Sequence, residues 1–128
     1  MAVDMNMKIL IVDDYKTMLR IVRNLLYQLD FSNVDEATDG AMALSMLKRE
    51  KYDLVISDWN MRPVTGIELL REMRGDADLK HIPFIMITAE STAETVAAAQ
   101  QAGVSSYIIK PFNAKVLKER LVGVLGPF

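Results

Sequence analysis

The sequence of 128 residues contains no cysteine, which excludes disulfide bonds, thiolate metal sites and thiol catalysis. No apolar run approaches the roughly 20 residues that span a bilayer, and residues 1–7 lack the basic head and long apolar segment of a secretory signal. The six glycines are scattered singly, so no glycine-rich loop is present to cradle a flavin or nucleotide phosphate. The lack of cysteine fits a reducing cytosol, so a cytoplasmic location is expected, and residues 1–7 are predicted to form a mobile lead-in.

The charge and size of the chain limit its partners and its organisation. The formal net charge is −2, which gives no reason to expect nucleic-acid binding. Apolar residues make up 51% of the chain, enough for an ordinary packed core. A length of 128 residues suits one domain and leaves little room for a second. We therefore predict a single domain over residues 1–128.

Short apolar segments alternate five times with helical patterns along the chain. The apolar segments span residues 8–12, 34–37, 54–57, 84–88 and 106–109. Most are apolar on both faces, which is typical of strands that are covered on both sides. The first helical pattern is a stripe of Met18, Val22, Leu25, Leu26 and Leu29. Right-handed crossovers then predict an α/β fold in which helices cover both faces of a parallel sheet.

Capping signals predict several helix boundaries. Thr65 and Ser91 are each followed by a glutamate three residues later, the spacing of a capping box at a helix start. Asn113 is a good N-cap for the last helix. Gly75 and Gly103 suit the left-handed residue that commonly closes a helix.

Polar side chains stand at the carboxyl ends of four of the apolar segments. They are Asp13, Asp14, Asp58, Thr88 and Lys110. Because the carboxyl ends of parallel strands share one edge of a sheet, where ligands of such folds bind, these side chains are expected to converge. Three carboxylates, a hydroxyl and an ammonium have the chemistry of a magnesium-assisted phosphoryl site.

The acidic residues suggest a metal site. Crowded carboxylates repel one another, and a divalent cation offsets that cost. Oxygen ligands favour a hard ion such as Mg²⁺, which also binds phosphate oxygens. We expect Asp14 and Asp58, with Asp13 through water, to hold it. The alternative is that Asp13 or Asp14 merely caps the first helix, but capping needs only one of them.

Asp58 is the candidate nucleophile, since a carboxylate can attack phosphorus and form an acyl phosphate. Lys110 is placed to neutralise charge on the transferring group, and the Thr88 hydroxyl to donate to a phosphoryl oxygen. The alternatives are an ordinary surface lysine and a threonine chosen for its strand propensity. For Tyr107 the residue pattern alone favours core packing.

The chain strongly resembles the receiver domains of two-component response regulators, and in particular their stand-alone chemotaxis members. The motifs that match in order and spacing are Asp13-Asp14, Asp58-Trp59-Asn60-Met61, Gly66, Thr88-Ala89-Glu90, residues 99–103 and residues 107–112. Each motif alone is weak, whereas the ordered set is highly specific and covers the chain from Lys8 onward. The resemblance implies a flavodoxin-like fold with five parallel strands in the order 2-1-3-4-5.

The resemblance also implies roles for individual residues. Asp58 would receive a phosphoryl group from a phosphohistidine of a sensor histidine kinase. Mg²⁺ would be held by Asp13, Asp14, Asp58 and the backbone carbonyl of Asn60. Thr88 and Lys110 would contact the phosphoryl group, with a cis bond between Lys110 and Pro111. Tyr107 would turn inward on activation, and the side chains of Asn60 and Glu90 would tune the lifetime of the acyl phosphate.

One loop departs from the family pattern. A proline usually follows the methionine directly, whereas here Arg62 comes first and Pro63 second. Val64-Thr65 then stands where similar proteins often carry an acidic residue before the glycine. The loop length is unchanged, so the site is expected to survive. Arg62 adds a positive charge that attracts an acidic partner or is simply solvated, and the second interpretation is the safer one.

The function expected from these features is a cytoplasmic, monomeric phospho-switch that is no enzyme beyond its own phosphorylation and dephosphorylation. Its output would be binding to an effector such as a flagellar motor switch protein. The binding surface would be the fourth helix, the fifth strand and the basic fifth helix, and a phosphatase would be a further partner. The nearest alternative is a phosphorelay intermediate or phosphate sink that passes phosphate to a histidine phosphotransfer protein. An aspartate-based phosphohydrolase is disfavoured, because Asn60 stands where its second acid is needed.

Overall fold

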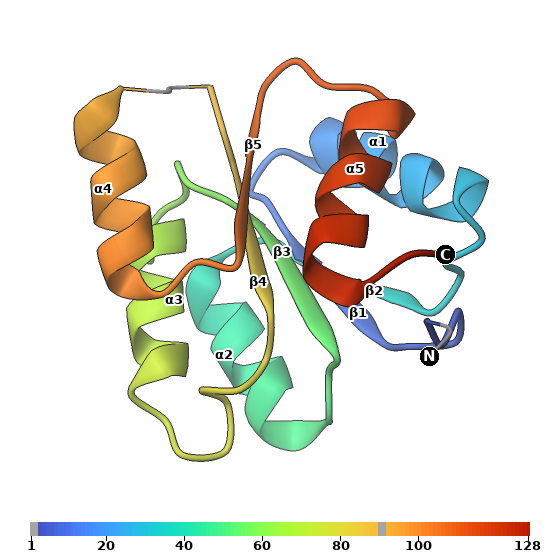
Figure 1. Ribbon diagram of the computed structural model, residues 1–128. Helices are drawn as coiled ribbons and strands as arrows, with labels where there is room; N and C mark the ends of the chain where they lie inside the picture. Colours follow the sequence, from blue (N-terminus) through green and yellow to red (C-terminus); the bar gives the residue numbers. More distant parts are fainter. Residues whose placement is uncertain (1–2, 90–91) are drawn as a thin grey trace.

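The computed structural model describes residues 3–89 and 92–128. They form a five-stranded parallel sheet with the order β2-β1-β3-β4-β5, flanked by helices (Figure 1). The strands are β1 (Ile9–Val12), β2 (Val34–Ala37), β3 (Leu54–Asp58), β4 (Phe84–Thr88) and β5 (Ser106–Ile109). The helices are α1 (Lys16–Gln28), α2 (Gly40–Arg49), α3 (Gly66–Arg74), α4 (Ala93–Ala102) and α5 (Ala114–Leu125). The predicted fold class and strand order are confirmed.

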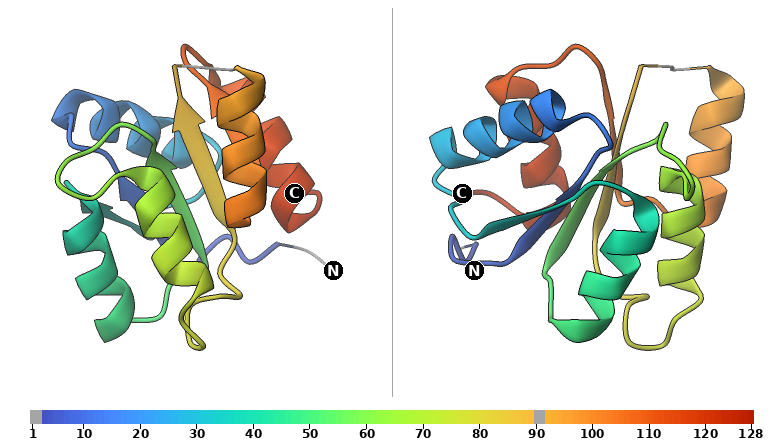
Figure 2. Two further views of the ribbon diagram at one scale, coloured as in Figure 1. Left: turned by 90° about the vertical axis from the view of Figure 1, so that its left-hand side faces the viewer. Right: turned by 180° about the vertical axis from the view of Figure 1, so that it is seen from behind.

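The sheet separates two helical layers. Helices α1 and α5 cover one face, and α2, α3 and α4 cover the other (Figures 1 and 2). Alternate residues of the interior strand β1 serve the two layers: Ile9 and Ile11 pack with α1 and α5, whereas Leu10 and Val12 pack with α2 and α3. All four side chains are buried, which explains why the segment reads as continuously apolar.

The strand boundaries agree with the sequence pattern, with two small shifts. The first strand begins at Ile9 rather than Lys8, and the third extends through Asp58. The edge strands are less covered than the central ones, since Ile109 of β5 is exposed. Among the described residues, no helix combines the length and the hydropathy needed to cross a membrane.

The capping predictions are partly confirmed. Thr65 forms the predicted capping box of α3, and the Asn113 side chain caps α5. The N-cap of α4 is Thr92, whose side chain accepts from the backbone of Thr95. Ser91, the predicted cap, lies outside the described residues.

The two predicted helix-closing glycines differ. Gly103 has a φ of 93° and closes α4 in the left-handed conformation. Gly75 has a φ of −85°, so the prediction of a left-handed residue there is wrong. The chain simply continues into a further turn, in which the backbone N–H of Asp76 donates to Met73.

Candidate functional site

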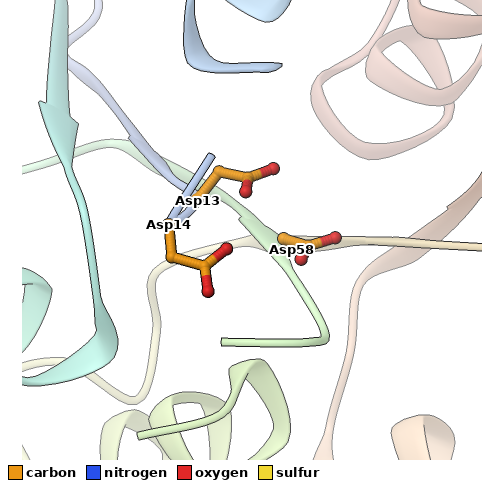
Figure 3. Close-up of side chains that lie close together, drawn as sticks. All are labelled: Asp13, Asp14 and Asp58. Atoms are coloured by element: carbon orange, nitrogen blue, oxygen red, sulfur yellow. The ribbon is translucent and has the colours of Figure 1, made fainter. Parts of the chain in front are cut away.

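Three carboxylates gather at the carboxyl edge of the sheet. Asp13 and Asp14 directly follow β1, and Asp58 is the last residue of the neighbouring strand β3 (Figure 3). Each offers an oxygen, and these oxygens all lie within 4.8 Å of one another. Asp13 and Asp58 are only 5% and 6% exposed, whereas Asp14 is exposed. The predicted convergence of the acidic residues is therefore present in the fold.

Lys110 reaches the same cluster from the end of β5. Its Nζ lies 2.7 Å from Asp58 Oδ1 and 4.0 Å from Asp13 Oδ2. The Lys110–Pro111 bond is cis, as the family resemblance implies. Because the ammonium pairs with the buried carboxylate of Asp58, the interpretation of Lys110 as an ordinary surface lysine is not supported by its position.

Thr88 lies at this edge as the last residue of β4 and is only 2% exposed. Its backbone carbonyl accepts a hydrogen bond of 2.7 Å from the backbone N–H of Lys110. The hydroxyl and the ammonium therefore belong to adjacent chain segments that are joined through their backbones. A group bound at Asp58 would have both polar side chains at the same end of the sheet.

Asp13 also has a local role, which differs from the capping alternative. Its Oδ1 accepts a hydrogen bond of 2.9 Å from the backbone N–H of Tyr15. Tyr15 is the N-cap residue of α1, and within the described part of the chain no side chain caps that helix. The Asp13 side chain thus closes the short turn before the helix, and neither aspartate caps it.

The charge of Asp13 is unfavourable in this surrounding. Burial raises the pKa of its carboxyl from 3.8 to about 6, against the lowering effect of the Tyr15 N–H. The charge of Asp58 raises the pKa further, that of Lys110 lowers it, and that of Asp14 raises it. A buried carboxylate that resists ionisation beside two others fits a hard divalent cation, because the cation supplies the missing positive charge.

The loop after Asp58 is held by backbone hydrogen bonds. The N–H of Trp59 donates to the carbonyl of Ile87 in β4, and its carbonyl accepts from the N–H of Gly66, both at 2.9 Å. A Cβ on Gly66 would lie 2.2 Å from the carbonyl oxygen of Asp58, so only glycine fits there. The sequence motif includes Gly66 without assigning it this role, because a close backbone approach leaves no signal in residue chemistry.

The remaining predicted residues lie near the cluster or outside the described chain. Tyr107 is half-buried in β5 and packs with the core beneath α2 and α3, while its hydroxyl lies 3.4 Å from Thr95 Oγ1 as a weak donor. Asn60 is exposed in the loop after β3. Glu90 lies outside the described residues. Arg62 is exposed, in line with the interpretation of a solvated side chain.

Comparison with known proteins agrees with this geometry. The family model of the response regulator receiver domain matches residues 9–122. The chain is 57% identical over 116 residues to chemotaxis protein CheY-3 of Vibrio cholerae, covering 91% of this chain and 89% of that protein. It is 53% identical over 115 residues to chemotaxis protein CheY of Pseudomonas aeruginosa, covering 90% of this chain and 93% of that protein.

Solved structures show the same fold. The crystallised CheY4 of Vibrio cholerae has a TM-score of 0.87 at 32% identity and covers 94% of this chain and 99% of its own. The receiver domain of a sensor histidine kinase from Pseudomonas aeruginosa has a TM-score of 0.85 at 26% identity, covering 95% and 99%, and carries a magnesium ion in its active-site cleft. Together with the match over residues 9–122, these likenesses show that the chain belongs to the response regulator receiver domain family.

Proposed function

We propose that this chain is a single-domain response regulator of a chemotaxis system in the cytoplasm, phosphorylated on Asp58 by a sensor histidine kinase. The observation that carries the proposal is the pairing of Lys110 with the buried Asp58 carboxylate, at 2.7 Å, inside a cluster of three acids. The chemotaxis assignment rests on the two chemotaxis relatives, each more than half identical to this chain.

The same cluster supports three of the proposed metal ligands. Asp13, Asp14, Asp58 and the backbone carbonyl of Asn60 would hold Mg²⁺, which when bound neutralises charge on phosphoryl oxygens. Asp58 would attack the phosphorus of a phosphohistidine, so that its P–N bond breaks, a P–O bond to the carboxylate forms, and the imidazole leaves. Lys110 would keep its ammonium beside the group, and Thr88 would offer its hydroxyl. The protein thus promotes only its own phosphorylation and dephosphorylation.

The response would be a population shift between two conformations of one monomer. Thr88 would move toward the phosphoryl group and Tyr107 would turn inward, favouring the state that holds the group better. The side chain of Asn60, which is exposed, would tune the lifetime of the acyl phosphate by controlling how water or a phosphatase approaches. The family resemblance gives Glu90 the same role. The switch therefore needs no second domain to change its surface.

The output surface would be formed by α4, β5 and α5. A groove of about 330 Å³ lies there, and its lining includes Val96, Tyr107, Ile109 and Arg120. Lys115, Lys118 and Arg120 are exposed on α5 and make the helix basic. Arg120 lines the partly apolar groove, and the basic character of α5 suits an acidic segment of an effector such as a flagellar motor switch protein.

Affinity capture before and after phosphorylation tests this function. The immobilised chain is treated with a small phosphodonor and Mg²⁺ and compared with untreated protein. We expect an effector to bind only after treatment, and binding to disappear in Asp58→Asn. Capture of a histidine phosphotransfer protein alone, with onward transfer of the phosphate, would instead identify a phosphorelay intermediate. Identical binding by the treated and untreated chains would refute the switch.

Lys110→Ala is expected to separate phosphorylation from the response. Asp58 still accepts phosphate, but the ammonium that links the new group to β5 is absent. Coupling between two sites usually changes affinity by about 5–150-fold, and we expect this gain to fall to nearly none. Titration of the captured effector measures it, with Lys51→Ala at the opposite end of the sheet as a control. A variant that keeps the full gain would exclude this role of Lys110.

A further inference from the structure

The carbonyl group of Asp58 lies just beyond the pairing of β3 with β1, although Asp58 is still in register with Ile87 of β4. The register of β1 with β3 ends at Val12 and Ser57, so Asp58 is the first residue of β3 past that pairing. Its carbonyl oxygen instead accepts a hydrogen bond of 2.9 Å from the hydroxyl of Ser57, a side chain with 0% exposure. The sequence shows Ser57 only as the polar member of an apolar strand.

We propose that Ser57 is a positioning residue that orients the backbone carrying the phosphoacceptor and the carbonyl ligand of Asn60. This inference rests on the proposed function of the site. The Asp58 carbonyl and the Trp59 N–H belong to one planar peptide group. Ser57 holds its oxygen, and the Ile87 carbonyl accepts from its N–H at 2.9 Å. That plane is thereby held at both its oxygen and its N–H.

The next peptide group is fixed in the same way. The Trp59 carbonyl accepts from the N–H of Gly66 at the start of α3. Only the two backbone dihedrals of Asn60 then separate this fixed plane from the Asn60 carbonyl. The two backbone dihedrals of Trp59 join the first plane to this second one, so the Ser57 hydroxyl supports the Asn60 carbonyl through two successive peptide planes.

The surroundings of the Asp58 carbonyl leave little room for a substitute donor. Gly66 approaches so closely that a Cβ there would stand 2.2 Å from the oxygen. Ser57 and Gly66 are both buried, and Asp58 is 6% exposed. If the hydroxyl is removed, the oxygen must stay unpaired or the peptide plane must rotate toward another donor. Either response loosens the loop that holds Asn60.

Two variants of Ser57 separate positioning from simple space filling. Ser57→Ala removes the donor and leaves a small apolar side chain in a buried strand, which a filling role would tolerate. Ser57→Cys replaces the hydroxyl by a somewhat larger thiol that is a weaker donor, so a positioning role places it between alanine and the wild type. Ile85→Val, a buried change in β4 away from the Asp58 carbonyl, controls for a general loss of core packing.

The test uses unphosphorylated full-length protein and two readouts. Mg²⁺ is titrated while the fluorescence of Trp59, the single tryptophan, is followed. Amide hydrogen exchange of Trp59 is measured without metal. We expect Ser57→Ala to raise the Kd for Mg²⁺ by about 10-fold, as losses of supporting hydrogen bonds around metal ligands do, and to speed exchange of the Trp59 amide. Ile85→Val should leave both close to the wild-type values.

The outcomes separate this inference from the proposed function. Wild-type affinity and wild-type exchange in Ser57→Ala would overturn the positioning role and leave the site intact. Equal weakening by Ser57→Ala and Ile85→Val would overturn it as well, since the effect would then be general. A wild-type protein that binds no Mg²⁺ and accepts no phosphate on Asp58 would refute the site itself, and the role of Ser57 would fall with it.

Discussion

Asp58→Asn is expected to reduce labelling by a small phosphodonor to background. The amide keeps the shape of the carboxylate and an oxygen that can accept from Lys110, so the fold remains. It lacks the anionic oxygen needed to attack phosphorus, and it removes one of the three acids that would hold Mg²⁺. Intact-protein mass spectrometry measures the phosphoryl group, and thermal unfolding checks the fold.

The control for this experiment is Asp78→Asn, which alters an exposed carboxylate away from the cluster. That variant should label like the wild type. Asp58→Asn protein labelled at normal stoichiometry would show that another residue is the nucleophile. Continuous turnover of a small phosphate ester by the wild type would point instead to a phosphohydrolase.

The site could be predicted from the sequence because its residues interrupt an otherwise regular pattern. Buried parallel strands are apolar on both faces, so a charged residue at a strand end is conspicuous. Asp58 and Lys110 both stand at such ends, and the crossover rule places those ends on one edge. The topology thus brings the two side chains together, and their opposite charges favour the ion pair at 2.7 Å.

The supports of the site could not be predicted in this way. The Ser57 hydroxyl bonds its neighbour's carbonyl, and Gly66 contacts the same oxygen, but both depend on the exact backbone path after β3. Serines occur in many strands and glycines at many helix starts without such contacts. Their roles appear only when the peptide planes are placed.

Long-range polar contacts at the other end of the sheet were equally hidden. The sequence pattern places Lys8 in the first strand, but it lies just before that strand. Its Nζ pairs with Glu50 at 3.0 Å and with Asp35 at 3.6 Å. The Tyr52 hydroxyl donates to the same Asp35 at 2.7 Å. These residues come from three separate segments without common spacing, so no periodicity connects them.

The second large effect concerns stability. In the absence of metal, replacing the buried Asp13 by a neutral residue is expected to stabilise the protein. Burial, opposed by the Tyr15 N–H, raises the pKa of Asp13 from 3.8 to about 6 in the folded chain. The folded state therefore holds this proton more tightly than the unfolded state. The stability linked to it is complete below pH 4 and is lost as the pH rises through about 6. At pH 7 the ionised side chain costs the fold about 1–3 kcal/mol.

Asp13→Asn should remove that cost, since the amide oxygen can still accept from Tyr15. In chelator at pH 7 we expect the free energy of unfolding to rise by about 1–3 kcal/mol, and the difference from the wild type to vanish near pH 4. Urea denaturation at both pH values measures this, with Asp78→Asn as the exposed control.

Magnesium should reverse the order of the two proteins. A ligand that binds only the folded state stabilises it by about 2.7 kcal/mol at 100 times its Kd, and the wild type would gain this stability. Asp13→Asn has lost one of the acids that attract the cation, so its gain should be much smaller. Equal gains in the two proteins would remove Asp13 from the metal site. If Asp13→Asn were less stable than the wild type in chelator, the ionised acids would not destabilise the fold. The physical reason for placing a cation among them would then be lost.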